Sequence, residues 1–286
     1  MERVVSRSEL VPWQNGREVV RSMTPAFRQN LGPTELVEDL FARYDQQPLL
    51  NDQHTTRRID LIDVKPGYRD LTNAYHDSVE ECLVLAGHLH LDGEGDFEAG
   101  DYFWRPPGFV HAASTDTGFR ALLMFQGDDP AEGSGPTSRR IQPDELAGTN
   151  QLHADPETAV GPRGWVRRQP TDLLPWLPGP AWSSTRHGQL DHPDLDRIEV
   201  RVLSENVGTG GQSLLARIGA GWHLPVRRLA ASLDIVVLDG ALHLGDDEPL
   251  VATDLVHLPA GEALELCSPV GARLFVKADD WLTPTH

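Results

Sequence analysis

The amino-acid sequence predicts a mainly β protein that consists of two small antiparallel barrels formed by internal duplication, with a short helix near the N-terminus. Short apolar segments with period-two alternation, separated by Gly and Pro turns, predict the strands. The same pattern recurs in the second half of the chain, where Ile235 stands 153 positions after Cys82. A length of 286 residues suits two domains of the usual ~100 to 200 residues each.

In the first half, the strands follow one another closely between about residues 74 and 125. Glu80, Cys82 and Val84 fall on one strand face, because side chains alternate along a strand. Gly87 predicts a hairpin turn before a returning strand. That strand places Leu89 and Leu91 inside, with His88 and His90 on the outer face. Later strands are expected over residues 101–106, 112–115 and 121–125, with a break at Pro107 and Gly108.

A helix is predicted over residues 33–44, which begin with a proline. Its apolar face combines Leu36, Val37, Leu40, Phe41 and Tyr44. We expect this face to pack on the outside of the barrel, and a lid over the barrel mouth is the alternative. A shorter helical turn is expected over residues 143–147.

The repeat extends along most of the two barrels. Residues 235–240 match 82–87, residues 241–244 match 88–91, and residues 253–261 match 100–108, all at the same offset. The arms before the barrels also match, since Leu-Val-Pro-Trp13 resembles Leu-Leu-Pro-Trp176. The Gly- and Pro-rich stretch that starts at Gly127 is typical of a surface linker. We therefore expect an N-terminal arm, helix and barrel over 1–130, a linker over 131–162 and a second barrel over 163–286.

Two motifs in the first barrel contain ligand-type side chains. Three residues separate His76 from Glu80, and His111 ends the run Pro-Pro-Gly-Phe-Val-His. The order His, three residues, Glu, six residues, Gly, followed by Gly, five residues, Pro-x-Gly-x-x-His, resembles the cupin superfamily between about residues 59 and 125. The Glu-Glu-x-x-Val-Leu-x-Gly run that ends at Gly87 is similar to that of anti-sigma-factor-type cupins and of acetylacetone-cleaving dioxygenases.

The resemblance implies two double-stranded β-helix barrels of the cupin, jelly-roll-like type, with a divalent metal in the first. Carried over by position, His76, Glu80 and His111 match metal ligands, and Ala74 stands where the family has a further histidine. Two histidines and one carboxylate suit non-heme Fe(II), and three ligands with an open position suit catalytic zinc. Fe(II) is the preferred metal, with Zn, Ni or Mn as alternatives. Other candidate ligands are Asn73, Tyr75 and His54.

At the same offset, Leu229, Leu233 and Leu264 replace the three ligands, and Arg227 replaces Ala74. The second barrel is therefore predicted to bind no metal and to have a filled apolar centre. His223, His243 and His257 lack the ligand spacing, so we interpret them as structural or exposed.

Around the metal we expect a small substrate pocket. Ala74, Cys82 and Trp104 are its candidate walls, and Tyr102 and Arg105 are the candidate catalytic hydrogen-bond donors. The predicted function is an Fe(II) dioxygenase that cleaves a C–C bond in a small β-dicarbonyl or hydroxy-ketone substrate with O2. One alternative is a non-redox cyclase, lyase or isomerase with Zn or Ni, and another is a non-catalytic small-molecule or metal-binding cupin.

The composition of the chain limits the classes of binding partner and the compartment that we expect. A net charge of -18 argues against nucleic acid, because phosphate binding requires a basic surface. No run approaches the length of a membrane span or the pattern of a signal peptide, and the two cysteines, one in each half, fit a reducing compartment. We expect a cytoplasmic protein with a small organic substrate, and exposed sheet edges favour a homodimer.

Overall fold

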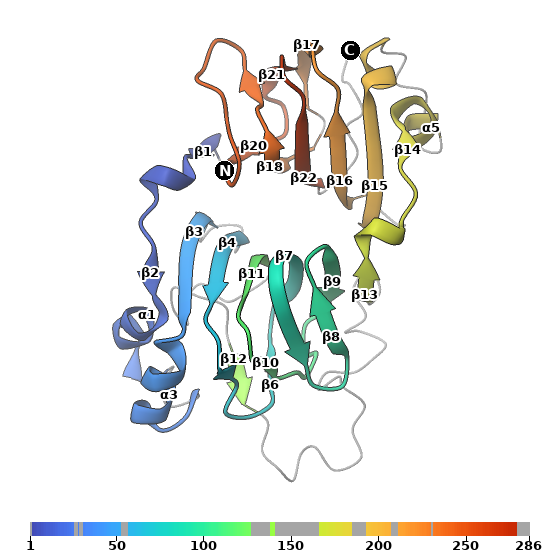
Figure 1. Cartoon of the computed structure of the whole chain (residues 1–286). Helices are drawn as coiled ribbons and strands as arrows, with labels where there is room; N and C mark the ends of the chain where they lie inside the picture. The colour runs from blue at the N-terminus through green and yellow to red at the C-terminus, as the bar shows by residue number, and fades with distance from the viewer. Residues whose placement is uncertain are drawn as a thin grey trace. The chain divides into compact units, whose positions relative to one another are not determined.

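The computed structural model describes residues 2–25, 28, 31–52, 57–126, 138–140, 166–184, 193–206, 211–229 and 231–278. The chain divides into two compact units. The N-terminal unit comprises Val11–Pro170, and the C-terminal unit comprises Thr171–His286 together with Met1–Leu10. Strands dominate both units, and the few helices are short (Figure 1).

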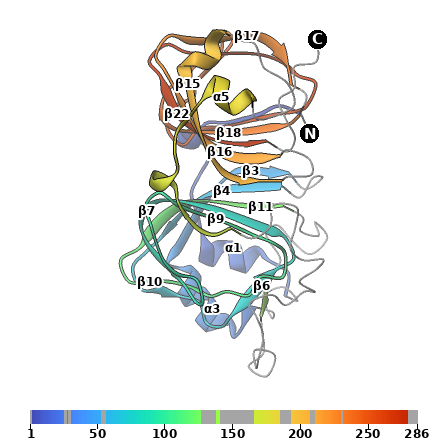
Figure 2. The same cartoon turned by 90° about the vertical axis from the view of Figure 1, so that its right-hand side faces the viewer.

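The N-terminal unit consists of a curved antiparallel sheet whose strand order is β13-β9-β7-β11-β4-β3-β2, with β5, β8 and β10 attached through β7 and β10. Figure 2 shows β7, β9 and β11 on one side of this unit and β6 and β10 on the other. Its elements are β2 (Gln14–Asn15), α1 (Gly16–Ser22), α3 (Thr34–Phe41), β3 (Tyr44–Asp52), β4 (Arg57–Val64), β5 (Tyr68–Arg69), β6 (Ala74–His76), β7 (Val79–Leu91), β8 (Gly95–Glu98), β9 (Asp101–Arg105), β10 (Ala113–Thr115), β11 (Phe119–Gln126), β12 (Ser138–Arg140) and β13 (Val166–Pro170).

The C-terminal unit contains a seven-stranded sheet, β1-β20-β18-β22-β16-β15-β14, and a three-stranded sheet, β17-β21-β19. Its elements are β1 (Val4–Ser6), η1 (Ser8–Leu10), η3 (Thr171–Leu173), β14 (Leu177–Pro178), α5 (Gly179–Ser184), η4 (Pro193–Arg197), β15 (Ile198–Glu205), β16 (Gln212–Ile218), β17 (Trp222–Arg228), β18 (Leu233–Gly240), β19 (His243–Leu244), β20 (Leu255–Leu258), β21 (Ala263–Ser268) and β22 (Ala272–Ala278).

Strand pairings in the two units repeat at the offset expected from the sequence. Glu80 of β7 lies opposite Phe125 of β11, and Leu233 of β18 lies opposite Ala278 of β22. Each of the two positions in the second pair is 153 residues after its counterpart in the first. The two units therefore share one strand arrangement, as a duplicated sequence predicts.

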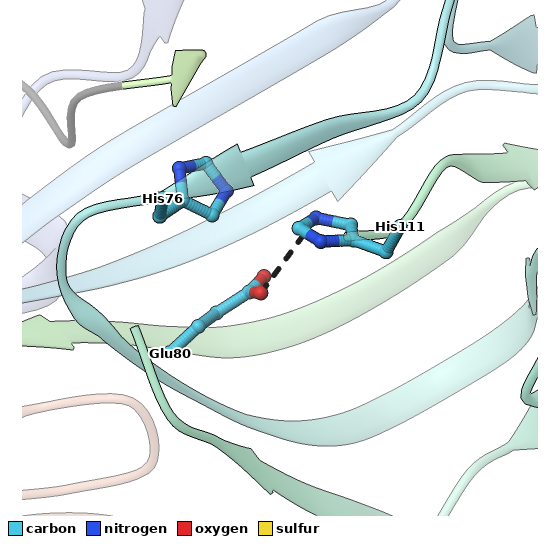
Figure 3. A group of neighbouring side chains, drawn as sticks. All are labelled: His76, Glu80 and His111. Carbon is cyan, nitrogen blue, oxygen red and sulfur yellow. Dashed lines mark ion pairs between the residues drawn. The ribbon is translucent and has the colours of Figure 1, made fainter. Parts of the chain in front are cut away.

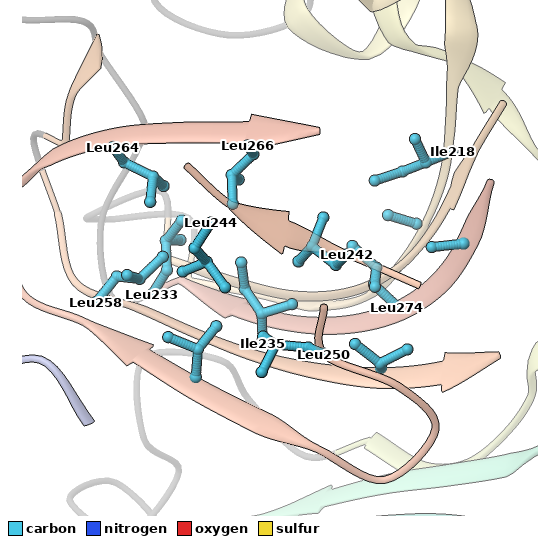
Figure 4. Close-up of a cluster of buried hydrophobic side chains, with 14 of the residues drawn as sticks. Ile218, Leu233, Ile235, Leu242, Leu244, Leu250, Leu258, Leu264, Leu266 and Leu274 are labelled. Atoms are coloured by element: carbon cyan, nitrogen blue, oxygen red, sulfur yellow. The ribbon is translucent and has the colours of Figure 1, made fainter. Parts of the chain in front are cut away.

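The centre of the C-terminal unit is filled with aliphatic side chains (Figure 4). Leu229, Leu233 and Leu264, which occupy the positions of the three candidate ligands, are 5%, 3% and 3% exposed. They pack with the neighbouring Leu244 and Leu258 in one apolar cluster. This arrangement agrees with the predicted filled core.

Gly87 does not form the predicted hairpin turn. Strand β7 continues through this glycine from Val79 to Leu91, and Gly87 has a φ of 78°. The pairing of β7 with β11 shifts its register between Arg120 and Ala121, close to the same point. Gly87 therefore bends a single strand so that its two halves join different parts of the barrel, because glycine tolerates a positive φ.

The domain boundaries also differ from those expected. Residues 4–6 were assigned to the first barrel, but β1 pairs with β20 in the C-terminal unit. Residues 166–170 were assigned to the second barrel, but β13 pairs with β9 in the N-terminal unit. Within the expected linker 131–162 the structure describes only β12, which pairs with β6.

Helix α3 is shorter than the predicted helix over 33–44, because Pro33 is its N-cap and Ala42 its C-cap. Leu36, which was expected on the packed face, is 54% exposed, whereas Val37 is buried. The helical turn expected over 143–147 lies outside the described residues. Among the described residues, no helix has the length and apolar character needed to cross a membrane.

Candidate metal centre

Three side chains of the N-terminal unit converge on one point. His76 ends β6, Glu80 lies near the start of β7, and His111 lies just before β10. One ligand atom from each lies within 4.8 Å of the other two, and Figure 3 shows the three side chains pointing toward one another. His111 Nε2 is 3.7 Å from Glu80 Oε2. The structure thus brings together all three residues that were expected to bind metal.

Backbone pairing brings His111 next to His76. Ala74 and His111 exchange two N–H···O bonds, each 2.9 Å long. The Gly108 N–H donates to the carbonyl of His76 at 2.8 Å, and Gly108 has a φ of 79°, which glycine adopts readily. The Pro-Pro-Gly turn therefore places the two imidazoles side by side, with ring centres 5.2 Å apart.

The environment of His111 determines which ring nitrogen is available to a metal. Its Nδ1 lies 3.1 Å from the carbonyl oxygen of Phe109. Because a carbonyl only accepts hydrogen bonds, Nδ1 carries the proton and Nε2 has a free lone pair. Burial lowers the pKa of His111 to about 3, so the ring is neutral near pH 7, as a metal ligand must be.

Glu80 is held as a carboxylate. Burial opposes its ionisation, but electrostatic interactions with His111, when that ring is protonated, and with the guanidinium of Arg105 bring its pKa down to about 2. Arg105 donates from NH1 to Glu80 Oε2 at 2.8 Å and also bonds Glu94 from NH2. The guanidinium is 4.0 Å from the centre of the Phe103 ring. Arg105 therefore holds the Glu80 carboxylate in position through this hydrogen bond.

The donor set fits a divalent cation. Two buried carboxylates, Glu80 and Glu94, face the single guanidinium of Arg105, and His111 is neutral, so these groups carry one excess negative charge. A buried charge is costly without compensation, and a divalent cation between Glu80 and the imidazoles would supply it. Two imidazoles and one carboxylate are the ligand set of non-heme iron sites and also suit catalytic zinc.

The three side chains form part of the wall of a cavity of about 210 Å³. Most of its lining is apolar and comes from β4, β7, β11, α1 and α3. Ala74 and Cys82 are at this wall, as expected, and Phe103 adds an aromatic ring from β9. Burial raises the pKa of the Cys82 thiol, so the thiol remains protonated.

Tyr102 and Trp104 are not at the cavity. Glu80 lies opposite Arg105 and Cys82 lies opposite Phe103, so these four residues share the inner face. Tyr102 and Trp104 alternate with them and point the other way. The Tyr102 hydroxyl donates to Glu81 Oε1 at 2.5 Å. The pocket roles expected for Tyr102 and Trp104 are therefore wrong, and Arg105 is in contact with Glu80 rather than the cavity.

The structure adds residues that were not predicted. Arg58 and Asp60 of β4 line the cavity and form a buried ion pair, with Arg58 Nε 2.5 Å from Asp60 Oδ2. Their alternation with Ile59 and Leu61 is a visible sequence signal, because charged residues at every second position of a strand share one face. Which face becomes the interior depends on strand pairing, and the sequence pattern does not show it.

Helix α3 contributes to the cavity instead of packing on the barrel exterior. Val37, Leu40 and Phe41 are among the lining residues. Tyr44, at the start of β3, also lines the cavity. Its pKa is raised, mainly by burial and to a smaller extent by the negative charge of Asp60. The alternative position of the predicted helix, over the barrel mouth, is the one that these contacts support.

The remaining histidines occupy other places. His88 and His90 share the carboxylate of Asp96, at 3.1 and 2.8 Å, on the partly exposed outer face. In the C-terminal unit His257 is buried and lies 2.6 Å from Asp234, and His223 is exposed beside Glu265. His54 lies outside the described residues, and the described Asn73 and Tyr75 are not among the cavity residues.

Comparisons with known proteins agree with this architecture. Residues 39–128, a segment of the N-terminal unit, match the family described as the ChrR cupin-like domain. The three candidate metal ligands, His76, Glu80 and His111, all lie inside this segment. No curated protein sequence matched the chain.

Solved structures resemble the whole chain at low sequence identity. A candidate dioxygenase from Nostoc punctiforme is 16% identical, with 98% of this chain and 83% of that chain covered and a TM-score of 0.69. Oxalate decarboxylase from Bacillus subtilis is 13% identical, with 85% and 74% covered and a TM-score of 0.52. A variant of salicylate 1,2-dioxygenase from Pseudoaminobacter salicylatoxidans is 14% identical, with 78% and 71% covered and a TM-score of 0.50. These similarities establish the mainly β cupin fold predicted from the sequence.

Proposed function

We propose that the protein is a metal-dependent cupin oxygenase, a non-heme Fe(II) dioxygenase that cleaves a C–C bond in a small β-dicarbonyl or hydroxy-ketone substrate. The observation that supports this most directly is the convergence of His76, Glu80 and His111 within 4.8 Å on the wall of a mostly apolar cavity. A site with three protein ligands leaves positions for a chelating substrate and O2. The similarity to two cupin structures described as dioxygenases is consistent with this activity.

When bound, Fe(II) supplies the Lewis acidity that stabilises an enolate and the electrons that activate O2. The protein residues provide the environment for this chemistry. Arg105 keeps Glu80 ionised and oriented through the 2.8 Å hydrogen bond, and Phe109 holds the His111 proton on Nδ1. Tyr44 and Cys82 remain protonated because burial raises their pKa. They therefore act as neutral walls or hydrogen-bond donors rather than bases.

The cavity supports a small, largely apolar substrate with one chelating end. Ala74 offers no ligand atom next to His111, with which it shares backbone pairing, so this side of the site leaves space for substrate oxygens. Phe125 contacts His76 edge-on, with ring centres 5.1 Å apart, and contributes an apolar wall. Such walls exclude water from the reacting groups.

The test is metal analysis of untagged protein followed by oxygen uptake with acetylacetone and benzoylacetone. We expect one equivalent of iron per chain after anaerobic reconstitution and one O2 consumed per diketone cleaved. Glu80→Gln and His111→Leu should each reduce iron binding at least tenfold. His90→Ala is the matched control, since His90 lies on the outer face of the same barrel, and it should retain both iron and activity.

Other results would redirect the assignment. Diketone turnover without O2 consumption, in protein loaded with zinc or nickel, would replace the dioxygenase by a non-redox lyase, cyclase or isomerase. Protein that binds no metal under reconstituting conditions would contradict any metal-dependent function and leave a binding protein as the assignment.

A further inference from the structure

Two strands away from Glu80 in the same sheet, the cavity wall carries a second polar group. Arg58 and Asp60 line the cavity from β4, and their side chains are 9% and 2% exposed. Asp60 uses Oδ2 for its bond to Arg58. Among the described residues, Asp60 Oδ1 is buried and has no hydrogen-bond partner. A buried carboxylate oxygen without a partner is unfavourable, and it is therefore available to a donor that enters the cavity.

Strand register places this pair relative to the metal-type residues. Arg58 of β4 lies opposite Phe125 of β11, and Phe125 lies opposite Glu80 of β7. Two residues further along β4, Asp60 lies opposite Leu123 of β11, and Leu123 lies opposite Cys82 of β7. Because adjacent strands are about 4.8 Å apart, the backbones of β4 and β7 are roughly 10 Å apart at this level. The surface between them is apolar, with the side chains of Phe125 and Leu123 in the lining.

We propose that Arg58 and Asp60 form a specificity subsite that binds a hydroxyl group at the distal end of the substrate, whose chelating end occupies the His76, Glu80 and His111 site. This inference rests on the proposed metal-dependent function and specifies the class of substrate: a diketone or hydroxy-ketone joined by an apolar segment, such as an aromatic ring, to an alcohol or phenol. The unpartnered Asp60 Oδ1 accepts the hydrogen bond from that hydroxyl.

The charges of the subsite favour a neutral group. Asp60 neutralises Arg58 across the 2.5 Å ion pair, so the pair has no net charge to attract a second carboxylate. An anion beside Asp60 would meet a like charge in a buried site. A hydroxyl supplies the missing donor without adding charge. Tyr44 lines the same cavity.

The test compares two probes that differ only at the distal position: 1-phenylbutane-1,3-dione and its para-hydroxyl derivative. Both are titrated by calorimetry into full-length protein loaded with Zn(II), which is redox-inert, so that binding is measured without turnover. We expect the hydroxyl probe to bind about tenfold more tightly, since a hydrogen bond to a charged acceptor has about this effect.

The variant Arg58→Met/Asp60→Leu removes both charges together, because replacing a buried ion pair by apolar residues of similar size is tolerated better than leaving one charge unpaired. It should keep one equivalent of zinc and bind both probes equally. Asp60→Asn is a second, more conservative variant and should reduce the preference part of the way. The control is Arg217→Met/Glu199→Leu, an exposed cross-strand pair in the C-terminal unit, which should keep the full preference.

The possible failures are distinguishable. Equal binding of the two probes by zinc-loaded wild type would overturn the subsite and leave the metal centre intact, as would a double variant that folds, binds zinc and keeps the preference. Wild-type protein that binds no zinc, or zinc-loaded protein that binds neither diketone, would overturn the proposed function and the subsite with it.

Discussion

Arg105 is the residue on which the buried charges of the N-terminal unit depend. It is 1% exposed and is the shared partner of Glu80 and Glu94. Its guanidinium also lies over the Phe103 ring. The side chain therefore has a structural role and a functional one, since it stabilises the barrel and holds the carboxylate that faces the two imidazoles.

Replacing Arg105 by Met should reduce the free energy of unfolding by about 3–5 kcal/mol, because it leaves two carboxylates buried without their cation. Urea denaturation of the metal-free protein measures this change. Arg217→Met, at a side chain that is 50% exposed and bonded to Glu199 at 3.0 Å, should change it by less than about 1 kcal/mol. A small effect at Arg105 would mean that its charge does not compensate Glu80 and Glu94.

His111 should make the stability of metal-free protein depend on pH. Burial lowers its pKa from 6.5 to about 3, so below pH 6.5 the unfolded chain takes up a proton that the folded chain does not. Stability is therefore complete above pH 6.5 and falls as the pH decreases toward 3. By pH 4.5 the loss should reach about 2–3 kcal/mol, at roughly 1.4 kcal/mol per pH unit for one proton.

The variant His111→Leu tests this pH dependence, and leucine is the residue at the equivalent position, Leu264, of the C-terminal unit. Between pH 6.5 and 4.5 it should lose about 2–3 kcal/mol less stability than the wild type, because the raised pKa of Asp60 and of Asp70 acts equally in both proteins. The pKa of Glu80 is lowered from 4.5 to about 2, so this carboxylate affects stability only below pH 4.5. Equal changes in stability of the wild type and of His111→Leu between pH 7 and 4.5 would show that the imidazole is not buried in its neutral form.

At the scale of elements, the course of the chain after residues 86 and 239 depends on glycine. Gly87 and Gly240 both have a φ of 78°. A Cβ on Gly87 would lie 2.2 Å from the Gly118 carbonyl oxygen, and one on Gly240 would lie 2.1 Å from that of Gly271. The close approach to the neighbouring backbone is thus the same in the two units and leaves no space for a side chain, although β7 continues through Gly87 and β18 ends at Gly240.

Gly87→Ala should destabilise the N-terminal unit more than Gly95→Ala does. Both residues have a positive φ, but a Cβ at Gly95 would meet no atom within 4 Å. Gly95→Ala should therefore cost about 1–2 kcal/mol of backbone strain, and Gly87→Ala should exceed this through its backbone clash. Thermal and urea unfolding of the two variants provide the comparison, and equal losses would contradict the close approach.

At the scale of the whole molecule, each unit is completed by a strand from the other half of the sequence. Ser6 of β1 lies opposite Leu255, and Gln169 of β13 lies opposite Tyr102. Leu255 and Tyr102 are equivalent positions of the duplicated barrels. Asp254 secures the first arm by accepting from the Ser8 backbone N–H at 2.8 Å. Asp101 secures the second, with Arg168 Nε at 2.8 Å.

Deletion of residues 2–10 should expose the edge of β20 and destabilise the C-terminal unit. Hydrogen–deuterium exchange should become at least tenfold faster at the backbone amides of residues 255–258. In β9, which keeps its own arm β13, exchange should stay the same and serves as the internal control. If β20 retains its protection after the deletion, the arm does not stabilise this unit.

Several features were readable in the sequence because they depend on local pattern. The period of two identified most strands, and a constant offset aligned the two halves and showed that Leu229, Leu233 and Leu264 replace the ligand-type residues. The spacing around His76, Glu80 and His111 selected the residues that the structure brings together. Period two also placed Tyr102 and Trp104 on the strand face opposite that of Phe103, although it did not show which face is interior.

Other features were decided by tertiary structure, because they depend on which distant segments pair. Non-local pairing places residues 4–6 in the C-terminal unit and residues 166–170 in the N-terminal unit. The need for glycine at position 87 depends on the Gly118 backbone beside it. The order β4-β11-β7 in the sheet places Arg58 and Asp60 two strands from Glu80, and the packing of α3 adds its apolar side chains to the cavity lining. The sequence by itself thus determined the duplicated β architecture and the candidate ligands, whereas non-local strand pairing determined the cavity and the groups that face a substrate within it.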